Sequence, residues 1–108
     1  LYAYRQVASV RSSDRDDYET ALQTFSGTLV RSGLAAAMAA LERIRKRHGS
    51  QALLRHLAGA SIPRLEGTAA DQLAGRVRGL DVDAYMLATR EILRLTAWFR
   101  RAAQAEFE

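Results

Sequence analysis

Residues 82–107, VDAYMLATREILRLTAWFRRAAQAEF, form the longest helical pattern of the chain and decide its fold. At about 100° per residue, the apolar side chains project to one broad face and three arginines to the opposite face. The apolar face comprises Tyr85, Ala88, Ile92, Leu95, Phe99 and Ala102, and the opposite face carries Arg90, Arg94 and Arg101. The pattern predicts a helix about 39 Å long that packs one side and exposes a positive stripe.

The same helical spacing recurs upstream of this segment, and alternating runs of β-branched residues are absent. The side chains expected in the core are Tyr18, Leu22, Phe25, Leu29, Leu34, Met38, Leu41, Ile44, Leu53, Leu54, Leu57, Leu73 and Val77. No linker or repeat divides the pattern. We therefore expect residues 1–108 to form one all-α domain, a single compact bundle of about six helices with a long C-terminal helix.

Short polar residues and glycines predict where these helices begin and end. The expected caps are Ser12, Ser13 and Asp14 for the second helix, Ser50 for the fourth, Thr68 with Asp71 for the fifth, and Asp81 for the last. Gly33, Gly49 and Gly79 are the expected helix ends, and residues 59–67, around Pro63, are the expected main loop. Because helical spacing starts at Leu1 and runs to Arg11, we expect some native N-terminal residues to be missing.

The composition is basic, with 16 Lys and Arg against 12 Asp and Glu, a net charge of +4 and a pI near 10.1. All of the basic residues except Lys46 are arginines, whose planar forks suit phosphates and carboxylates. A nucleic acid or an acidic protein is therefore the expected partner. Without cysteine the chain has no disulfide, thiolate zinc site or cysteine nucleophile, and short apolar stretches and no signal peptide favour the cytoplasm over a membrane.

Candidate catalytic groups are few. His48 and His56 are separated by an expected helix break and have no carboxylate at metal-binding spacing, so we expect neither a catalytic nor a metal role. His48 is expected in the last turn of the third helix and His56 beside the core. No glycine-rich phosphate motif is present. We expect no enzyme activity, cofactor or metal.

Two basic groups are the candidate nucleic-acid-binding residues. The first, the basic run, comprises Arg43, Arg45, Lys46 and Arg47 beside His48; a helix C-terminus would explain part of it, and phosphate binding would explain all of it. The second, the arginine stripe, comprises Arg90, Arg94 and Arg101, which could instead pair with Glu91 and the acidic cluster at residues 14–17. Trp98 and Tyr85 could stack on bases, but their position favours the core.

Two segments resemble a known family. Residues 18–41, YETALQTFSGTLVRSGLAAAMAAL, and residues 83–105, DAYMLATREILRLTAWFRRAAQA, resemble the small subunit of the Cmr complex, the type III-B CRISPR effector that targets RNA. The second segment carries the family's pattern in Tyr85, Ala88, Thr89, Glu91, Leu93, Trp98, Arg101 and Ala102, and LLRHLAG at residues 53–59 matches its Leu-rich short helix. Ser32 departs from the family's usual asparagine, and Gly33 is expected to make the turn alone.

The resemblance implies a non-catalytic helical subunit in antiviral defence. Several copies would stack head to tail beside the larger backbone subunits and flank the guide RNA and target RNA. The alternative is a small helical adaptor that binds an acidic protein through the same arginines and makes no RNA contact.

Overall fold

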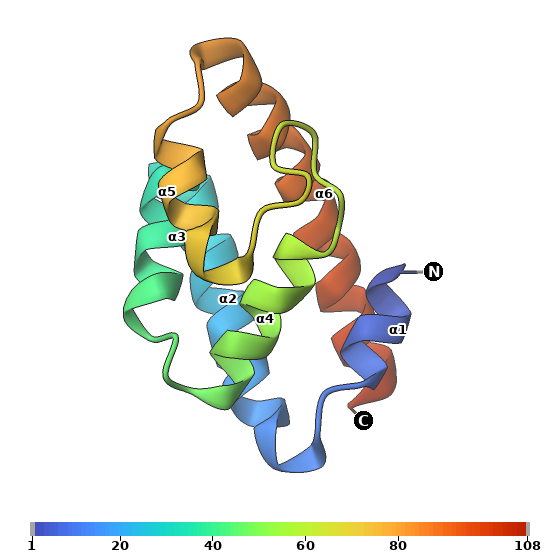
Figure 1. Ribbon diagram of the computed structural model, residues 1–108. Helices are drawn as coiled ribbons and strands as arrows, with labels where there is room; N and C mark the ends of the chain where they lie inside the picture. Colours follow the sequence, from blue (N-terminus) through green and yellow to red (C-terminus); the bar gives the residue numbers. More distant parts are fainter. Residues whose placement is uncertain (1, 108) are drawn as a thin grey trace.

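Helices follow one another through residues 2–107, the part of the chain that this computed structural model describes (Figure 1). The α-helices are α1 (Tyr2–Ala8), α2 (Arg15–Ser32), α3 (Leu34–Arg43), α4 (His48–Ala58), α5 (Leu73–Arg78) and α6 (Val82–Glu106). Two short 3-10 helices, η1 (Ser12–Asp14) and η2 (Ala70–Gln72), precede α2 and α5. No strand occurs within these residues, and the predicted all-α bundle of about six helices with a long C-terminal helix is confirmed.

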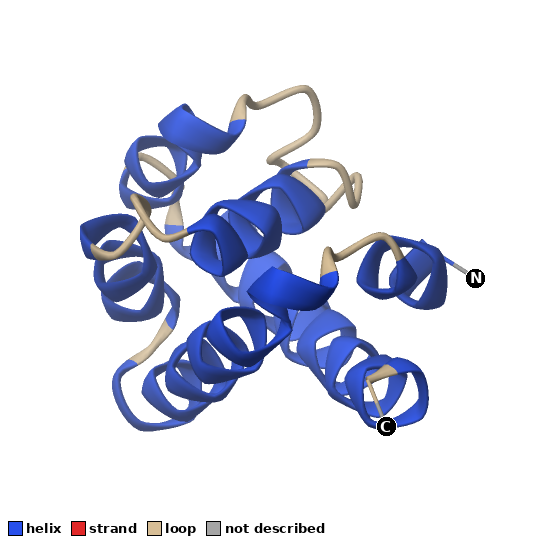
Figure 2. Ribbon diagram, turned by 90° about the horizontal axis from the view of Figure 1, so that it is seen from below, coloured by secondary structure: helices blue, strands red, loops and turns tan. Residues whose placement is uncertain are grey.

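Helix α2 lies between α3 on one side and α6 on the other, and α4 packs against it (Figure 1, Figure 2). Helix α1 packs along α6. All six α-helices contribute side chains to one hydrophobic core, in which Tyr18, Phe25 and Phe99 are the largest fully buried members. Every apolar side chain expected in the core from residues 18–77 is buried except Ile44, which is half-buried. Apolar periodicity therefore predicts this core almost residue by residue.

Helix α6 begins and ends close to the predicted positions. The Asp81 carboxylate accepts a hydrogen bond from the Ala84 amide at 2.8 Å, which confirms the predicted N-cap. The helix ends at Glu106, one residue before the predicted end. Its buried residues include Ala88, Ile92, Phe99 and Ala102, so the predicted packed face is confirmed along the length of the helix.

The turn between α2 and α3 is made by Gly33, whose φ is 91°. Its ψ of 175° is extended, so the residue has the expected positive φ without the left-handed helical ψ. The hydroxyl of Tyr85 on α6 accepts a hydrogen bond from the Ala35 amide at 2.9 Å. Tyr85 thus satisfies one of the free amides at the start of α3. Its side chain, which was predicted in the core, is half-buried and packs against the core.

Several predicted helix boundaries are wrong. Leu1 lies outside the described residues, and α1 ends at Ala8, before the expected end at Arg11. Residues 12–14 do interrupt the helices, but as the 3-10 helix η1, and no side-chain cap is made at Asp14. The capping box of Thr68 and Asp71 does not form, because η2 precedes α5 and the Thr68 hydroxyl is buried without a partner. Tertiary packing and 3-10 turns thus replace local caps at these positions.

The largest correction concerns the junction of α3 and α4. Helix α3 ends at Arg43, and α4 begins at His48, so Gly49 does not end a helix and Ser50 is not a cap. Gly49 lies in the first turn of α4, where a Cβ would clash with the Tyr18 backbone nitrogen and lie 2.7 Å from the Asp17 carbonyl carbon. Glycine is required there because two helix backbones approach closely. His48 accordingly starts α4 and does not lie in the last turn of the preceding helix.

A buried hydrogen bond joins α2 to α4. The Tyr18 hydroxyl and Nδ1 of His56 form a hydrogen bond of 2.8 Å, and both side chains are buried. Burial lowers the pKa of His56 from 6.5 to about 4, and the positive charge of Arg55 acts in the same direction. His56 is therefore neutral near pH 7, with one ring nitrogen protonated and the other free to accept a hydrogen bond. His56, which was predicted beside the core, is thus itself buried, at 5% exposure.

Candidate nucleic-acid interface

The basic run occupies the connection between α3 and α4. Arg43 lies in the last turn of α3, Arg45 and Lys46 lie in the turn that follows, and Arg47 immediately precedes α4. All four side chains are exposed. Arg43 lies in the last turn of α3, where a cation offsets the negative end of the helix dipole, whereas Arg47 stands at the positive end of the next helix, where a cation is unfavourable. The C-terminus of α3 therefore does not explain the whole run.

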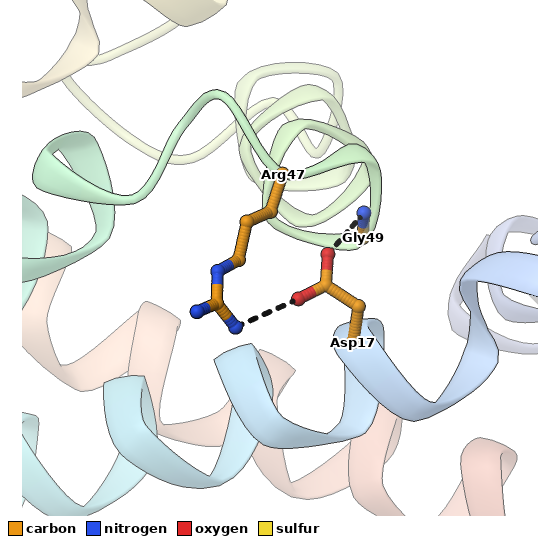
Figure 3. A network of polar contacts seen from close by, with 3 residues as sticks. All are labelled: Asp17, Arg47 and Gly49. Carbon is orange, nitrogen blue, oxygen red and sulfur yellow. Dashed lines mark hydrogen bonds and ion pairs between the residues drawn. The ribbon is translucent and has the colours of Figure 1, made fainter.

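The acidic start of α2 anchors this connection. One oxygen of the Asp17 carboxylate accepts a hydrogen bond from the Gly49 amide at 2.7 Å, and the other lies 3.6 Å from the Arg47 guanidinium (Figure 3). Nearby, the Asp14 carboxylate lies 3.7 Å from Nδ1 of His48. Asp17 thus pairs with the α3–α4 connection and Asp14 with the first residue of α4. The alternative that the acidic cluster pairs with the arginine stripe is wrong, whereas its other part is confirmed by the pair of Glu91 with Arg94.

A hollow of about 270 Å³ opens beside the basic run. Its lining residues come from the α3–α4 connection, from α4 and from η2: Arg45, Lys46, Gln51, Leu54, Arg55, Ala70 and Asp71. The folded chain thus adds Arg55 to the cations that the sequence grouped together. Arg55 could not be predicted as part of this site because it lies outside the basic run, although it falls one helical turn after Gln51.

The arginine stripe lies on the exposed face of α6, as predicted. Arg94 contacts Glu91 at 3.3 Å, and both side chains are exposed enough for this pair to contribute little. The guanidinium of Arg101 lies 5.3 Å from the centre of the Trp98 ring. Among the described residues, Arg90 and Arg101 take part in no ion pair. Two of the three stripe arginines therefore keep their charge available to an external anion.

Trp98 does not belong to the core. Its side chain is 41% exposed and packs edge-on against Tyr4 of α1, with the ring centres 6.5 Å apart. The prediction of a core tryptophan is wrong because position 98 lies at the border of the packed face, where α1 covers only part of the ring. The indole is thus presented to solvent beside Arg101.

Exposed apolar side chains flank the arginine stripe on both sides. Val82, Met86 and Leu93 are 73%, 57% and 42% exposed. At about 100° per residue they project to one side of the stripe, while Leu87 and Trp98 project to the other. A single helix thus presents cations between two rows of apolar groups.

The basic run and the arginine stripe lie on different sides of the molecule. Helix α2 stands between α3, from which the basic run extends, and α6, which carries the stripe (Figure 1, Figure 2). The fold therefore brings Arg45 and Lys46 together with Arg55, but it does not merge the two predicted basic groups into one surface. A polyanion that contacts both groups has to pass around the bundle.

Within residues 2–107 no group of three or more His, Asp and Glu side chains is arranged to hold a metal ion. No helix in this part of the chain has the length and apolar character needed to cross a membrane.

Comparison with protein families decides the identity. The sequence model of the family described as CRISPR-associated protein (Cas_Cmr5) matches residues 1–106. This chain belongs to the Cas_Cmr5 family. Cas_Cmr5 proteins are small, non-catalytic subunits of the Cmr complex, the type III-B CRISPR effector of antiviral defence. No significant match is found among curated proteins or solved structures.

Membership in the Cas_Cmr5 family confirms the resemblance seen in the sequence and extends it over almost the whole chain. The chain is a component of the Cmr complex and associates with other subunits of that complex. The long C-terminal helix with the arginine stripe and the α3–α4 connection with the basic run both lie within the matched residues.

Proposed function

We propose that this Cas_Cmr5 subunit is not an enzyme and that it helps to hold guide RNA and target RNA in the Cmr complex. In this proposal several copies stack along the complex, beside its backbone subunit, in the cytoplasm. The RNA contacts are made by the basic run and the arginine stripe: Arg43, Arg45, Lys46, Arg47, Arg90, Arg94 and Arg101. One observation carries the proposal, namely that the arginines of the stripe are exposed on one face of α6 in a subunit of an RNA-targeting complex.

The charge pattern supports a contact with phosphate. Arg90 and Arg101 have no ion-pair partner among residues 2–107, and Arg45 and Lys46 have none either. Unpaired guanidinium groups on a helix surface bind phosphates through charge-assisted hydrogen bonds, without reading the sequence of bases. Such binding suits a subunit that has to accept any guide and its matching target.

The exposed apolar groups support the stacking. Val82, Met86, Leu93 and Trp98 are exposed on the same helix as the stripe, and apolar groups gathered beside polar ones are typical of interaction surfaces. Contacts with neighbouring subunits would cover them, while the arginines between them face RNA at the junction. Stacking and RNA binding thus use adjacent parts of α6.

The test replaces Arg90 and Arg94 with glutamate in the assembled Cmr complex. Capture of target RNA should fall, and the slope of log affinity against log salt should become shallower, because phosphate contacts release counterions. The matched control replaces Arg31 and Arg78, which are exposed on α2 and α5, with glutamate, and should leave capture of target RNA unchanged. Circular dichroism of each free variant checks the helical fold.

Unchanged capture at several salt concentrations would overturn the RNA role of the stripe. In that case, a salt-insensitive, RNA-independent association with one acidic protein would favour the adaptor function, since an apolar interface does not depend steeply on salt.

A further inference from the structure

The hollow beside the basic run combines cations with an apolar floor. Arg45 and Lys46 reach its rim from the α3–α4 connection, and Arg55 reaches it from α4. Leu54, which is buried, and Ala70, which is half-buried, are the two apolar residues that line the hollow. The three cations come from segments that meet only in the folded chain, so the cluster is a product of the tertiary structure.

The cations of the hollow are not neutralised by acidic side chains within residues 2–107. Within residues 2–107, Arg45, Lys46 and Arg55 take part in no ion pair, and Asp71 is the only acid among the lining residues. The connection that carries Arg45 and Lys46 is held in place at its far end by the hydrogen bond from Gly49 to Asp17. The hollow therefore presents an anchored, positively charged rim.

Three properties define the ligand. The floor suits a flat, apolar ring, the cations suit a phosphate, and a volume of about 270 Å³ suits a group smaller than a drug-sized molecule. The rim also carries acceptors, the carboxylate of Asp71 and the amide oxygen of Gln51. A ribose hydroxyl or a base amino group can donate to them, whereas the side chains of an acidic peptide offer only further acceptors.

We propose that this hollow is a binding site for one nucleotide of single-stranded RNA. The base lies on Leu54 and Ala70, and its phosphate lies against Arg45, Lys46 and Arg55. The proposal rests on the proposed RNA role of the subunit and gives that role a defined subsite. It also assigns a function to Arg55, which is neither in the basic run nor in the arginine stripe.

The experiment is photo-crosslinking in the assembled Cmr complex, with guide and target RNA that contain 4-thiouridine. Trypsin cleaves after Arg47 and Arg55, so residues 48–55, HGSQALLR, form one peptide that contains three lining residues of the hollow, Gln51, Leu54 and Arg55. The peptides 91–94 and 95–100 report on α6 separately. We expect an RNA adduct on peptide 48–55.

The variant Arg45→Gln with Arg55→Gln lacks the cleavage site after residue 55, so its adduct is read on peptide 48–64 and compared with the sum of the adducts on peptides 48–55 and 56–64 of the parent. The yield should fall by about fivefold, because two charge-assisted contacts to phosphate are lost. The matched control, Arg31→Gln with Arg78→Gln, removes two exposed arginines elsewhere and should leave the yield unchanged.

Adducts on peptides 91–94 or 95–100 without any on 48–55 would overturn the nucleotide site and leave the proposed function standing. An adduct yield over residues 48–64 that is unaffected by the double variant would also overturn it. Absence of every RNA adduct from this subunit, together with unchanged capture in the Arg90 and Arg94 variant, would reject both the site and the proposed function. If a neighbouring subunit, and not RNA, covers residues 48–55 in the complex, the hollow is a protein contact and the proposal is overturned.

Discussion

The Asp17 carboxylate on α2 accepts the amide hydrogen of Gly49 on α4, with a donor–acceptor distance of 2.7 Å. Gly49 is the second residue of α4, and the residue that precedes the helix, Arg47, makes no side-chain cap. A carboxylate from another helix thus performs the role that a local capping residue usually performs. Its negative charge also lies near the positive end of α4. The start of α4, and with it the basic run, is therefore positioned by α2.

Replacing Asp17 with alanine should destabilise the fold by about 1–2 kcal/mol, because the Gly49 amide loses its acceptor in a half-buried position. Asp17→Asn keeps an oxygen acceptor and should lose less stability. The measurement is urea unfolding followed by circular dichroism, with Asp16→Ala at the exposed neighbouring position as the control. Equal stability of the Asp17 and Asp16 variants would show that this contact does not anchor α4.

Gly49→Ala should disrupt the packing of α4 against α2 and lower the stability more than the loss of a surface contact does. The new Cβ would clash with the Tyr18 backbone nitrogen and stand 2.8 Å from a carboxylate oxygen of Asp17, and a backbone cannot move away as a flexible side chain can. Gly75→Ala is the matched control, because its Cβ would meet nothing closer than 3.8 Å, at the end of the Arg78 side chain. Thermal unfolding should show a large drop in Tm for the first variant. The second should match or exceed the parent, since alanine favours a helix.

The buried His56 predicts a loss of stability in mild acid. Its pKa is about 4 in the folded chain and 6.5 in the unfolded chain, so the unfolded state binds more protons between these values. The stability contributed by neutral His56 is therefore complete above pH 6.5 and decreases by up to about 3 kcal/mol as the pH falls towards 4.

His56→Asn retains an acceptor near the position of Nδ1 but does not titrate, so its stability should depend less on pH over this range. The measurement is the free energy of unfolding between pH 4 and 7, compared with the parent and with His48→Asn at the exposed histidine. A parent curve that is flat between these pH values would show that His56 does not resist protonation.

The exposed apolar groups on α6 lead to a prediction about assembly. Met86→Asp and Leu93→Asp should leave the isolated subunit folded, because both positions are exposed on the helix. Each should reduce the number of copies retained in the complex, because a charge in an apolar interface has to be desolvated. Native mass spectrometry of the assembled complex measures this number. Thr24→Asp, an exposed position on α2, controls for added charge, and a normal copy number for both α6 variants would exclude this surface from the stacking contacts.

Local periodicity was sufficient to predict most of the fold. The apolar face of α6, the cap at Asp81 and the turn at Gly33 are set by residues close in sequence, and the structure confirms each of them. The junction of α3 and α4 could not be predicted, because the decisive contact joins Gly49 to Asp17, 32 positions apart. A glycine that permits close approach of two helices has the same local signature as a glycine that ends one.

The candidate interface likewise has features that local sequence predicts and features that depend on tertiary packing. The arginine stripe follows from the helical projection alone, and so does its exposure. The inclusion of Arg55 beside Arg45, and the pairing of Arg47 with Asp17, depend on how α2 and α4 pack. The burial of Trp98 was predicted wrongly because helical projection gives the direction of a side chain around the helix and does not show how much of that side chain α1 covers.

The basic run should divide into cations that bind RNA and a cation that is partly neutralised. Arg45 lines the hollow and has no ion-pair partner among the described residues, whereas the guanidinium of Arg47 lies 3.6 Å from Asp17. Arg45→Ala should therefore weaken RNA capture by the assembled complex more than Arg47→Ala does, and it should lower the salt slope by about one phosphate contact. Neither variant should change stability by more than about 1 kcal/mol, because both side chains are exposed and exposed ion pairs contribute little. Affinities for RNA measured over a salt series test the order of capture, and unfolding curves for the free subunits test the change in stability. A larger loss of capture for Arg47→Ala than for Arg45→Ala would show that Asp17 orients Arg47 towards RNA and does not offset its charge.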